Sequence, residues 1–287
     1  MKLKRNLFSA PLCFVINMVL VYVVYEICRL VFLATNWSVF SEAMTWGAFG
    51  EMLHGGWYFD TSAILYTNAL YALLMLFPIH YKERGWYQKM AKWVFVIFNS
   101  ICIIANLVDC VYFKYTTRRT TVTVFSEFRN EKNLGGIFGV EILNHWYLVL
   151  IGIILIAGLW FLYRMPKGKL PVEASRPYQP KRLLTYYGVH LLCLAVFVPF
   201  CVAGMRGGFT TAVRPITISN ANQYVNRPQE AAIVLNTPFS IIRTIDKPVF
   251  VVPDYYTEKQ LNAIYSPIHT PSDTLVKRKK NVVVIII

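Results

Sequence analysis

Long apolar runs separated by short polar segments are the dominant pattern of this chain of 287 residues. A helix needs about 20 apolar residues to cross a hydrocarbon core ~30 Å thick, and five of the runs have about that length. Tryptophan and tyrosine gather near their ends, as they do at the boundary between water and lipid. The pattern predicts an all-α polytopic membrane module with five transmembrane helices within residues 1–204, at about 12–33, 62–80, 93–113, 145–163 and 183–204. The first run is too long for the core of a signal peptide, so we expect an uncleaved helix.

The composition changes after Gly204. Residues 205–280 are mostly polar and punctuated by proline, which predicts a linker of short helices. We expect one helix to start near residues 219–222, a second to cover much of 231–245 with an interruption at Pro238, and a third to begin near 257–261.

An unbroken β-branched run ends the chain. Residues 277–280 are basic, Asn281 follows, and residues 282–287 are all valine or isoleucine. Such a run is typical of a strand buried on both faces of a parallel sheet, and it needs neighbouring strands to satisfy its backbone. We therefore expect residues 281–287 to be the first strand of a missing α/β domain that would follow in a longer protein.

The distribution of lysine and arginine predicts the orientation. Thirteen basic residues lie before the first expected helix and in the second-to-third and fourth-to-fifth connections, against five in the connections on the other side. Because short cytoplasmic segments are enriched in lysine and arginine, the N-terminus is expected in the cytoplasm and the linker outside the membrane.

The overall composition supports a membrane protein. Hydrophobic residues make up 56% of the chain and charged residues only 15%, compared with about 25% charged in soluble domains. The net charge of +14 is explained by basic residues in short loops, so we expect no nucleic-acid partner. All six cysteines lie in apolar runs, with no zinc-site or disulfide-framework spacing.

Three charged residues fall inside expected spans. Glu26 and Arg29 are three positions apart, so they share a helix face and can form an intramembrane pair. Asp109 lies in the third expected span, where it can receive an arginine from another helix or loop. Charges at membrane depth are costly and often functional, but a packing role for the first pair is the simpler interpretation.

Four arginines are candidate contacts for a lipid headgroup or an anionic substrate because they lie on the expected outer side: Arg118, Arg119, Arg206 and Arg214. The alternative is an ordinary charged surface, with acidic residues as partners. We find no complete catalytic constellation, no catalytic residue, no metal ligand set and no nucleotide-binding motif in the sequence.

The order of several short motifs resembles the lipoteichoic acid synthase family, membrane-anchored members of the sulfatase branch of the alkaline phosphatase superfamily. The motifs are residues 109–113 (DCVYF), 118–121 (RRTT), 206–208 (RGG), 214–216 (RPI), 236–239 (NTPF) and 280–287 (KNVVVIII).

The resemblance implies an enzyme in the bacterial plasma membrane that transfers or hydrolyses phospho-alcohol or sulfate ester groups on a lipid-borne substrate outside the membrane. It also implies a divalent metal of the manganese or zinc type in the missing sulfatase-like domain, and none in this chain, which would serve as anchor and linker among membrane lipids. Two alternatives stay open: a small transporter or channel lined by the intramembrane charges, and a non-enzymatic membrane adaptor.

Overall fold

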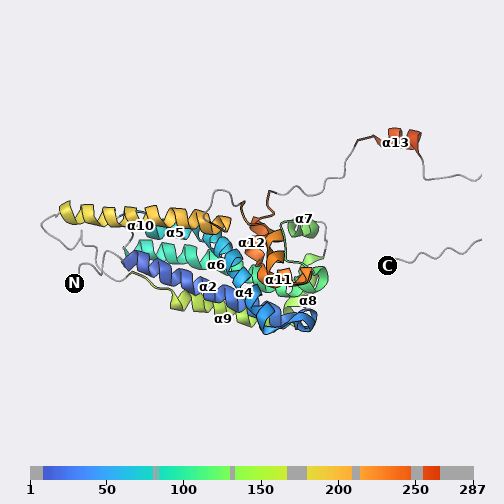
Figure 1. Ribbon diagram of the computed structural model, residues 1–287, viewed down its shortest axis with the longest axis horizontal. Helices are drawn as coiled ribbons and strands as arrows, with labels where there is room; N and C mark the ends of the chain where they lie inside the picture. Colours follow the sequence, from blue (N-terminus) through green and yellow to red (C-terminus); the bar gives the residue numbers. More distant parts are fainter. Residues whose placement is uncertain are drawn as a thin grey trace, which may run out of the picture. The chain divides into compact units, whose positions relative to one another are not determined.

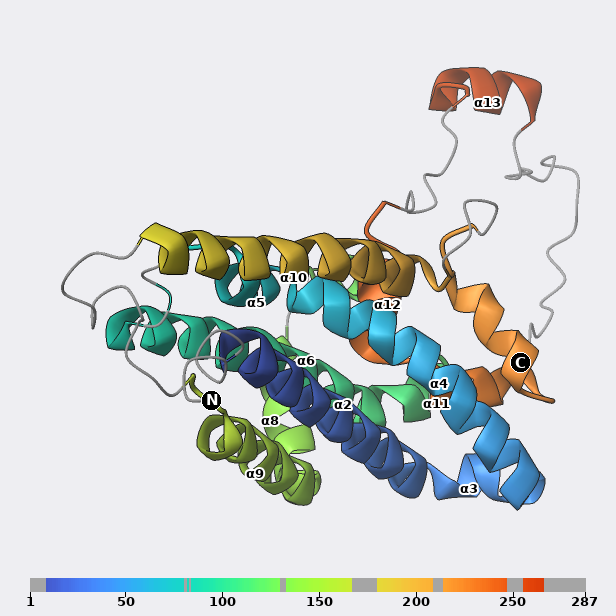
Figure 2. The ribbon, with the colours of Figure 1, turned by 60° about the vertical axis from the view of Figure 1, so that its left-hand side comes forward.

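Three long helices carry the most apolar runs of the chain. They are α2 (Ser9–Thr35), α6 (Gly85–Thr116) and α10 (Pro180–Arg206), which lie lengthwise beside one another in Figures 1 and 2. The structure is a computed structural model that describes residues 9–79, 82, 84–129, 133–166, 180–208, 214–246 and 255–265. Within these residues the regular elements are all helical, which confirms the predicted fold class.

Two further pairs of helices are long and apolar enough to span a membrane when each pair is taken together. They are α4 (Trp46–Thr67) with α5 (Ala69–Leu76), bent by 65°, and α8 (Leu134–Asn144) with α9 (Trp146–Leu162), bent by 83°. The described residues therefore hold three to five candidate membrane spans. Each of the five predicted spans overlaps one of these helices or pairs.

The second span differs from its prediction at both ends. Helix α4 begins at Trp46, where the Thr45 hydroxyl accepts a hydrogen bond from the Ala48 N–H at 3.2 Å. The predicted span at 62–80 starts later than α4, because glycines and charged residues before position 62 lower the hydropathy. The helix then breaks at Asn68, whose side-chain amide exchanges hydrogen bonds of 2.7 and 3.1 Å with that of Asn99 on α6.

Short helices follow α10. They are η3 (Ile218–Tyr224), η4 (Pro228–Glu230), α11 (Ala231–Val234) and α12 (Thr237–Ile242). The Asn236 side chain caps α12 by accepting from the Phe239 N–H at 2.8 Å, and Pro238 lies in the first turn, where a missing N–H costs little. The predicted helical segments near 219–222 and 231–245, with the interruption next to Pro238, are confirmed.

The apolar side chains of α11 and α12 belong to the core. Ile233, Val234, Leu235 and Phe239 are buried with residues of α2, α4 and α6, and Figure 1 shows α11 and α12 at one end of the bundle. We call residues 228–244 the docked segment. This packing was not predicted, because residues 205–280 as a whole are mostly polar.

The chain divides into two compact units, and the first comprises Met1–Lys247. Shorter helices complete this first unit. They are α3 (Trp37–Phe40) and η1 (Ser41–Ala43) after α2, and α7 (Val124–Arg129) after α6. The second unit comprises Pro248–Ile287, and its described part contains α13 (Glu258–Ile264), close to the predicted third linker helix. The expected strand at 281–287 lies outside the described residues.

Candidate functional site

Arg29 on α2 connects two helices of the bundle to the docked segment. Its Nε donates to Glu26 at 3.3 Å, and its Nη2 donates to the buried carboxylate of Asp60 on α4. Its Nη1 donates to the carbonyl oxygens of Ile233 and, at 2.8 Å, Val234. The structure thus brings the predicted Glu26–Arg29 pair together and adds a second carboxylate.

Arg119 makes a matching set of contacts from the loop after α6. Its Nη1 lies 3.2 Å from Oδ2 of Asp109, and its Nε donates to the Ala232 carbonyl at 2.7 Å. Its guanidinium also lies over the Phe32 ring, 3.5 Å from the centroid. Burial lowers the pKa of the Arg119 guanidinium, while the Asp109 carboxylate acts in the opposite direction.

The two aspartates hold the start of α12. The Asn236 amide donates to Asp60 at 2.8 Å, and the Thr237 hydroxyl donates to Asp109 at 2.7 Å. The Thr237 N–H also donates to the Asn106 side chain at 3.0 Å. Consecutive residues of the docked segment are therefore bound by carboxylates that belong to two different spans.

The brevity of α11 explains why arginines are needed here. In a helix of four residues only the Ala231 carbonyl accepts an N–H of the following turn, that of Leu235 at 3.0 Å. The next three carbonyls would be buried without a donor, which is unfavourable. Arg29 and Arg119 supply these donors, while the aspartates neutralise their charge, as buried cations require.

The predicted outer arginines do not form one cluster. Arg119 is buried, whereas the side chain of Arg118 is 64% exposed and lies 3.7 Å from Glu127. Arg206 ends α10, and its backbone carbonyl accepts from the Ile216 N–H at 3.0 Å. Arg214 is exposed and lines a pocket.

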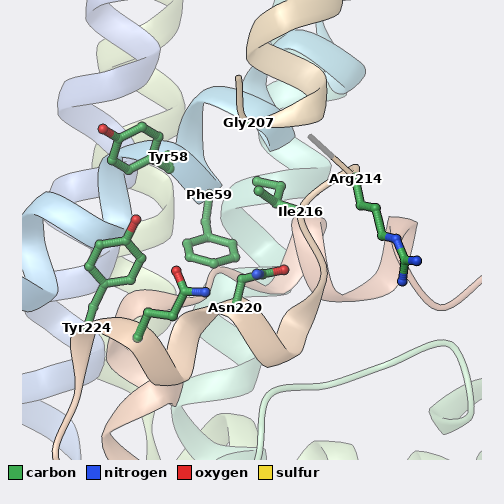
Figure 3. Close-up of a pocket in the computed structure, with 8 residues that line it drawn as sticks. Tyr58, Phe59, Gly207, Arg214, Ile216, Asn220 and Tyr224 are labelled. Carbon is green, nitrogen blue, oxygen red and sulfur yellow. The ribbon is translucent and has the colours of Figure 1, made fainter. Parts of the chain in front are cut away.

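That pocket has a volume of about 380 Å³ and is shown in Figure 3. Its lining comes from α4, η3 and the segment around Gly207, and comprises Tyr58, Phe59, Gly207, Arg214, Ile216, Asn220, Gln223 and Tyr224. The Tyr58 and Tyr224 rings face each other, with 6.2 Å between centroids and 20° between planes. Burial raises the pKa of the Tyr224 phenol. A phenol is protonated at neutral pH in any case, so Tyr224 can donate a hydrogen bond.

Two glycines shape the pocket. Gly207 has a φ of +82°, and a Cβ there would lie 2.2 Å from Cγ2 of Ile216. A Cβ on Gly55 would lie 2.4 Å from the Tyr224 ring. Larger residues at either position would displace a wall of the pocket.

Asp60 is the main site residue that sequence analysis missed. The available signal is a carboxylate two positions before an expected span, in a segment that the apolar pattern predicts to be a connection. The groups of the docked segment that bind Arg29 and Arg119 are mostly backbone carbonyls. Every residue has a backbone carbonyl, so these contacts cannot be recognised from residue types. Among the described residues no group of three or more histidine, cysteine, aspartate or glutamate side chains is arranged to hold a metal ion.

Comparison with known proteins identifies the family. Searches of curated proteins and of solved structures found no significant match. A family model described as the lipoteichoic acid synthase N-terminal domain matches residues 55–214, which include Asp60, Asp109 and Arg119. The chain therefore belongs to the lipoteichoic acid synthase family and contains its N-terminal membrane domain.

Proposed function

We propose that this chain anchors an extracytoplasmic enzyme domain in the bacterial plasma membrane and fixes its position there. The domain would transfer or hydrolyse phospho-alcohol, or sulfate, ester groups on lipid-borne substrates. The observation that carries the proposal is the attachment of the docked segment by Arg29 and Arg119, which contact three consecutive carbonyls. An anchor that only tethered its cargo would need no such attachment.

The docked segment is fastened to other parts of the module as well. Arg243 donates to the Met205 carbonyl of α10 at 2.7 Å, and the Thr244 hydroxyl accepts from the Val122 N–H at 3.0 Å. Each contact restricts the direction in which the chain leaves the module. Restricting this direction limits the volume that a following domain can explore, which raises its effective concentration at the membrane.

The orientation follows from the positive charges. With more lysine and arginine in the N-terminal segment and the alternate connections, the N-terminus is cytoplasmic and residues 205–280 are the extracytoplasmic linker. The pocket beside Arg214 then lies on the outer side. Its arginine, two tyrosines and two side-chain amides suit the phosphate and hydroxyl groups of a lipid headgroup.

The exposure and contacts of the four candidate arginines distinguish which of them could bind a headgroup. Arg214 and Arg118 are exposed and are proposed as headgroup contacts. Arg206 ends α10, directly before the pocket residue Gly207, and stays a candidate contact. The guanidinium of Arg119 is already bound by Asp109 and Ala232, so we propose a structural role for it. The divalent metal of the manganese or zinc type, which the family implies, would be held by the following domain.

Reporter fusions test the location. A phosphatase that is active only after export, fused after residue 246, is expected to be active, and a fluorescent protein fused after residue 166 is expected to fluoresce in the cytoplasm. The reverse pattern would overturn the orientation. Purified residues 1–287 are expected to show no phosphotransferase or sulfatase turnover, and metal-dependent turnover by this chain would overturn the anchor assignment.

We do not propose a transporter. The buried charges Arg29, Asp60, Asp109 and Arg119 are bound to one another and to the docked segment, and no described contact aligns them along a path. The adaptor alternative depends on the terminal run at 281–287, which lies outside the described residues.

A further inference from the structure

Helix α8 (Leu134–Asn144) is apolar on nearly all sides, yet none of its residues is buried in the protein. Ile137, Val140, Ile142 and Leu143 are 47–75% exposed, and they point in several directions around the helix axis. A helix that is hydrophobic all round requires an apolar environment. The described part of the protein does not supply one for α8.

The junction with α9 shows what that environment is. His145 alone separates α8 from α9 (Trp146–Leu162), and the two helices are bent by 83°. Helix α9 has 17 residues, so it is about 25 Å long, at the short end of the range of about 17–25 residues for helices that span the hydrocarbon core. If α9 crosses the membrane, α8 lies nearly parallel to its surface.

The residues at the bend suit the boundary between water and lipid. Trp146 is 64% exposed and Tyr147 follows it, both being residues that favour this boundary. The single charged residue of α8 is Glu141, whose carboxylate lies 3.2 Å from the His145 ring and accepts from the Tyr115 hydroxyl at 3.2 Å. The carboxylate is thus directed toward the protein and away from lipid.

One side of α8 is held by neighbouring elements. The Phe138 ring packs against Phe128 of α7 with 5.5 Å between centroids and 76° between planes, and Tyr115 of α6 contacts Glu141. These contacts fix the helix at the end of α6 and leave its other sides open. In a membrane, lipid in contact with the exposed apolar residues of α9, such as Ile153 and Ile154, would also reach these open sides.

We propose that α8 is an interfacial helix that lies in the plane of the membrane surface, with Ile137, Val140, Ile142 and Leu143 inserted among lipid chains at the level of the headgroups. Such a helix inserts about 5–10 Å into the boundary between headgroups and acyl chains. It fixes the depth and rotation of α6 and α9 in the bilayer. This role is independent of any enzymatic activity of the protein.

Fluorescence quenching of a single environment-sensitive label tests the proposal in liposomes. The full chain with its six cysteines replaced by alanine receives one new cysteine: Leu143→Cys or Ile142→Cys on α8, Ile153→Cys on the exposed lipid side of α9, or Ser126→Cys on α7. The α8 labels are expected to resemble the label at 153, with quenching by a lipid-attached nitroxide at least about threefold stronger than at position 126. Iodide should quench position 126 most.

Two outcomes would overturn the proposal. Quenching of the α8 labels by iodide as at position 126 means that α8 is in water. Protection from both quenchers means that a protein surface, such as a second copy of the chain, covers it. Lipids with a photoreactive group near the carbonyls provide a second measurement on the unaltered chain: cross-links within residues 134–144 are expected, and their absence, with cross-links present in α9, would also overturn it.

Discussion

Arg29 and Arg119 perform the same structural task from different parts of the chain. Each joins an aspartate of one span to backbone carbonyls of α11. The planar guanidinium has several donors in a fixed arrangement, so one side chain can bind a carboxylate and carbonyls together. The polar contacts of α11 with the two arginines are therefore made through its backbone carbonyls, whose geometry is independent of side-chain identity in α11.

Arg119→Met should destabilise the module strongly. It leaves Asp109 buried without a cation and the Ala232 carbonyl without its donor, and loss of one partner of a buried pair costs about 3–5 kcal/mol. The midpoint of thermal unfolding in detergent is expected to fall by on the order of 10 °C. Adding Asp109→Asn should restore part of the loss, because the carboxylate charge is then removed.

Arg118→Met is the matched control for that measurement. The Arg118 side chain is mostly exposed and its nearest carboxylate oxygen, on Glu127, is 3.7 Å away, so the change should cost less than about 1 kcal/mol. Equal effects of the two substitutions would contradict the structural role of Arg119.

Gly56→Ala tests the fit of Arg29 against α4. A Cβ at position 56 would lie 2.5 Å from Cζ of Arg29, whose guanidinium is held on several sides and cannot move away cheaply. We expect a lower unfolding midpoint and faster proteolysis of the docked segment. Gly50→Ala on the same helix has nothing within 4 Å of its new Cβ, so it should be neutral or stabilise by about 0.5–1 kcal/mol through helix propensity. The same outcome for both variants would disprove the steric argument.

At the scale of elements, the break between α4 and α5 has a polar cause. The Asn68 side-chain amide pairs with that of Asn99 of α6 and also donates to the Ile64 carbonyl at 3.1 Å, so its polar groups have partners inside the bundle. The pair also aligns α5 with α6. A break of this kind inside a continuous apolar run is set by contacts between helices.

A double-mutant cycle with Asn68→Ala and Asn99→Ala should reveal coupling of about 1 kcal/mol, the range found for hydrogen bonds between membrane helices. Each single variant leaves one amide unpaired, so the double variant should be less destabilised than the sum of the two. Unfolding midpoints in denaturant would measure this, with the exposed Asn144→Ala as a control. Strict additivity would show that the amides do not stabilise the break together.

The same elements show what could be predicted from sequence. The spans were predictable because each contains an apolar run near the length that a bilayer requires, and the Glu26–Arg29 contact because positions three apart share a helix face. The start of α4 at Trp46 was missed, since glycines and charges there lower the hydropathy. Without that helix Asp60 had no predicted environment, and its pairing with Arg29 could not be inferred.

The docked segment shows a second limit to prediction from the sequence. Its short helices could be predicted from proline and capping residues, but their burial could not, because it depends on donors from α2 and from the loop after α6. Asp109 was expected to receive an arginine from another helix or loop. Its partner is Arg119, ten positions later, and identifying it required the reversal of the chain after α6.

At the scale of the whole molecule, the docked segment connects the membrane helices to the part of the chain after residue 246. If it positions an enzyme domain against lipid, loosening it should affect lipid-borne substrates more than soluble ones. Arg29→Gln removes the cation that joins Asp60 to the Ile233 and Val234 carbonyls. In the full gene product in liposomes, we expect turnover of a lipid-borne phosphodiester to fall about tenfold, because the reacting groups are no longer held close together.

A water-soluble chromogenic phosphodiester provides the comparison, since its turnover depends on the catalytic domain and not on its position relative to the membrane. It should stay within about twofold of the unaltered protein. Arg164→Gln, which changes an exposed arginine outside both the docked segment and the proposed headgroup contacts, should leave the ratio of the two activities unchanged. A parallel loss of both activities in Arg29→Gln would indicate that the protein had merely unfolded. Unchanged turnover of the lipid-borne substrate in a variant whose docked segment has become sensitive to protease would show that the attachment does not position the domain.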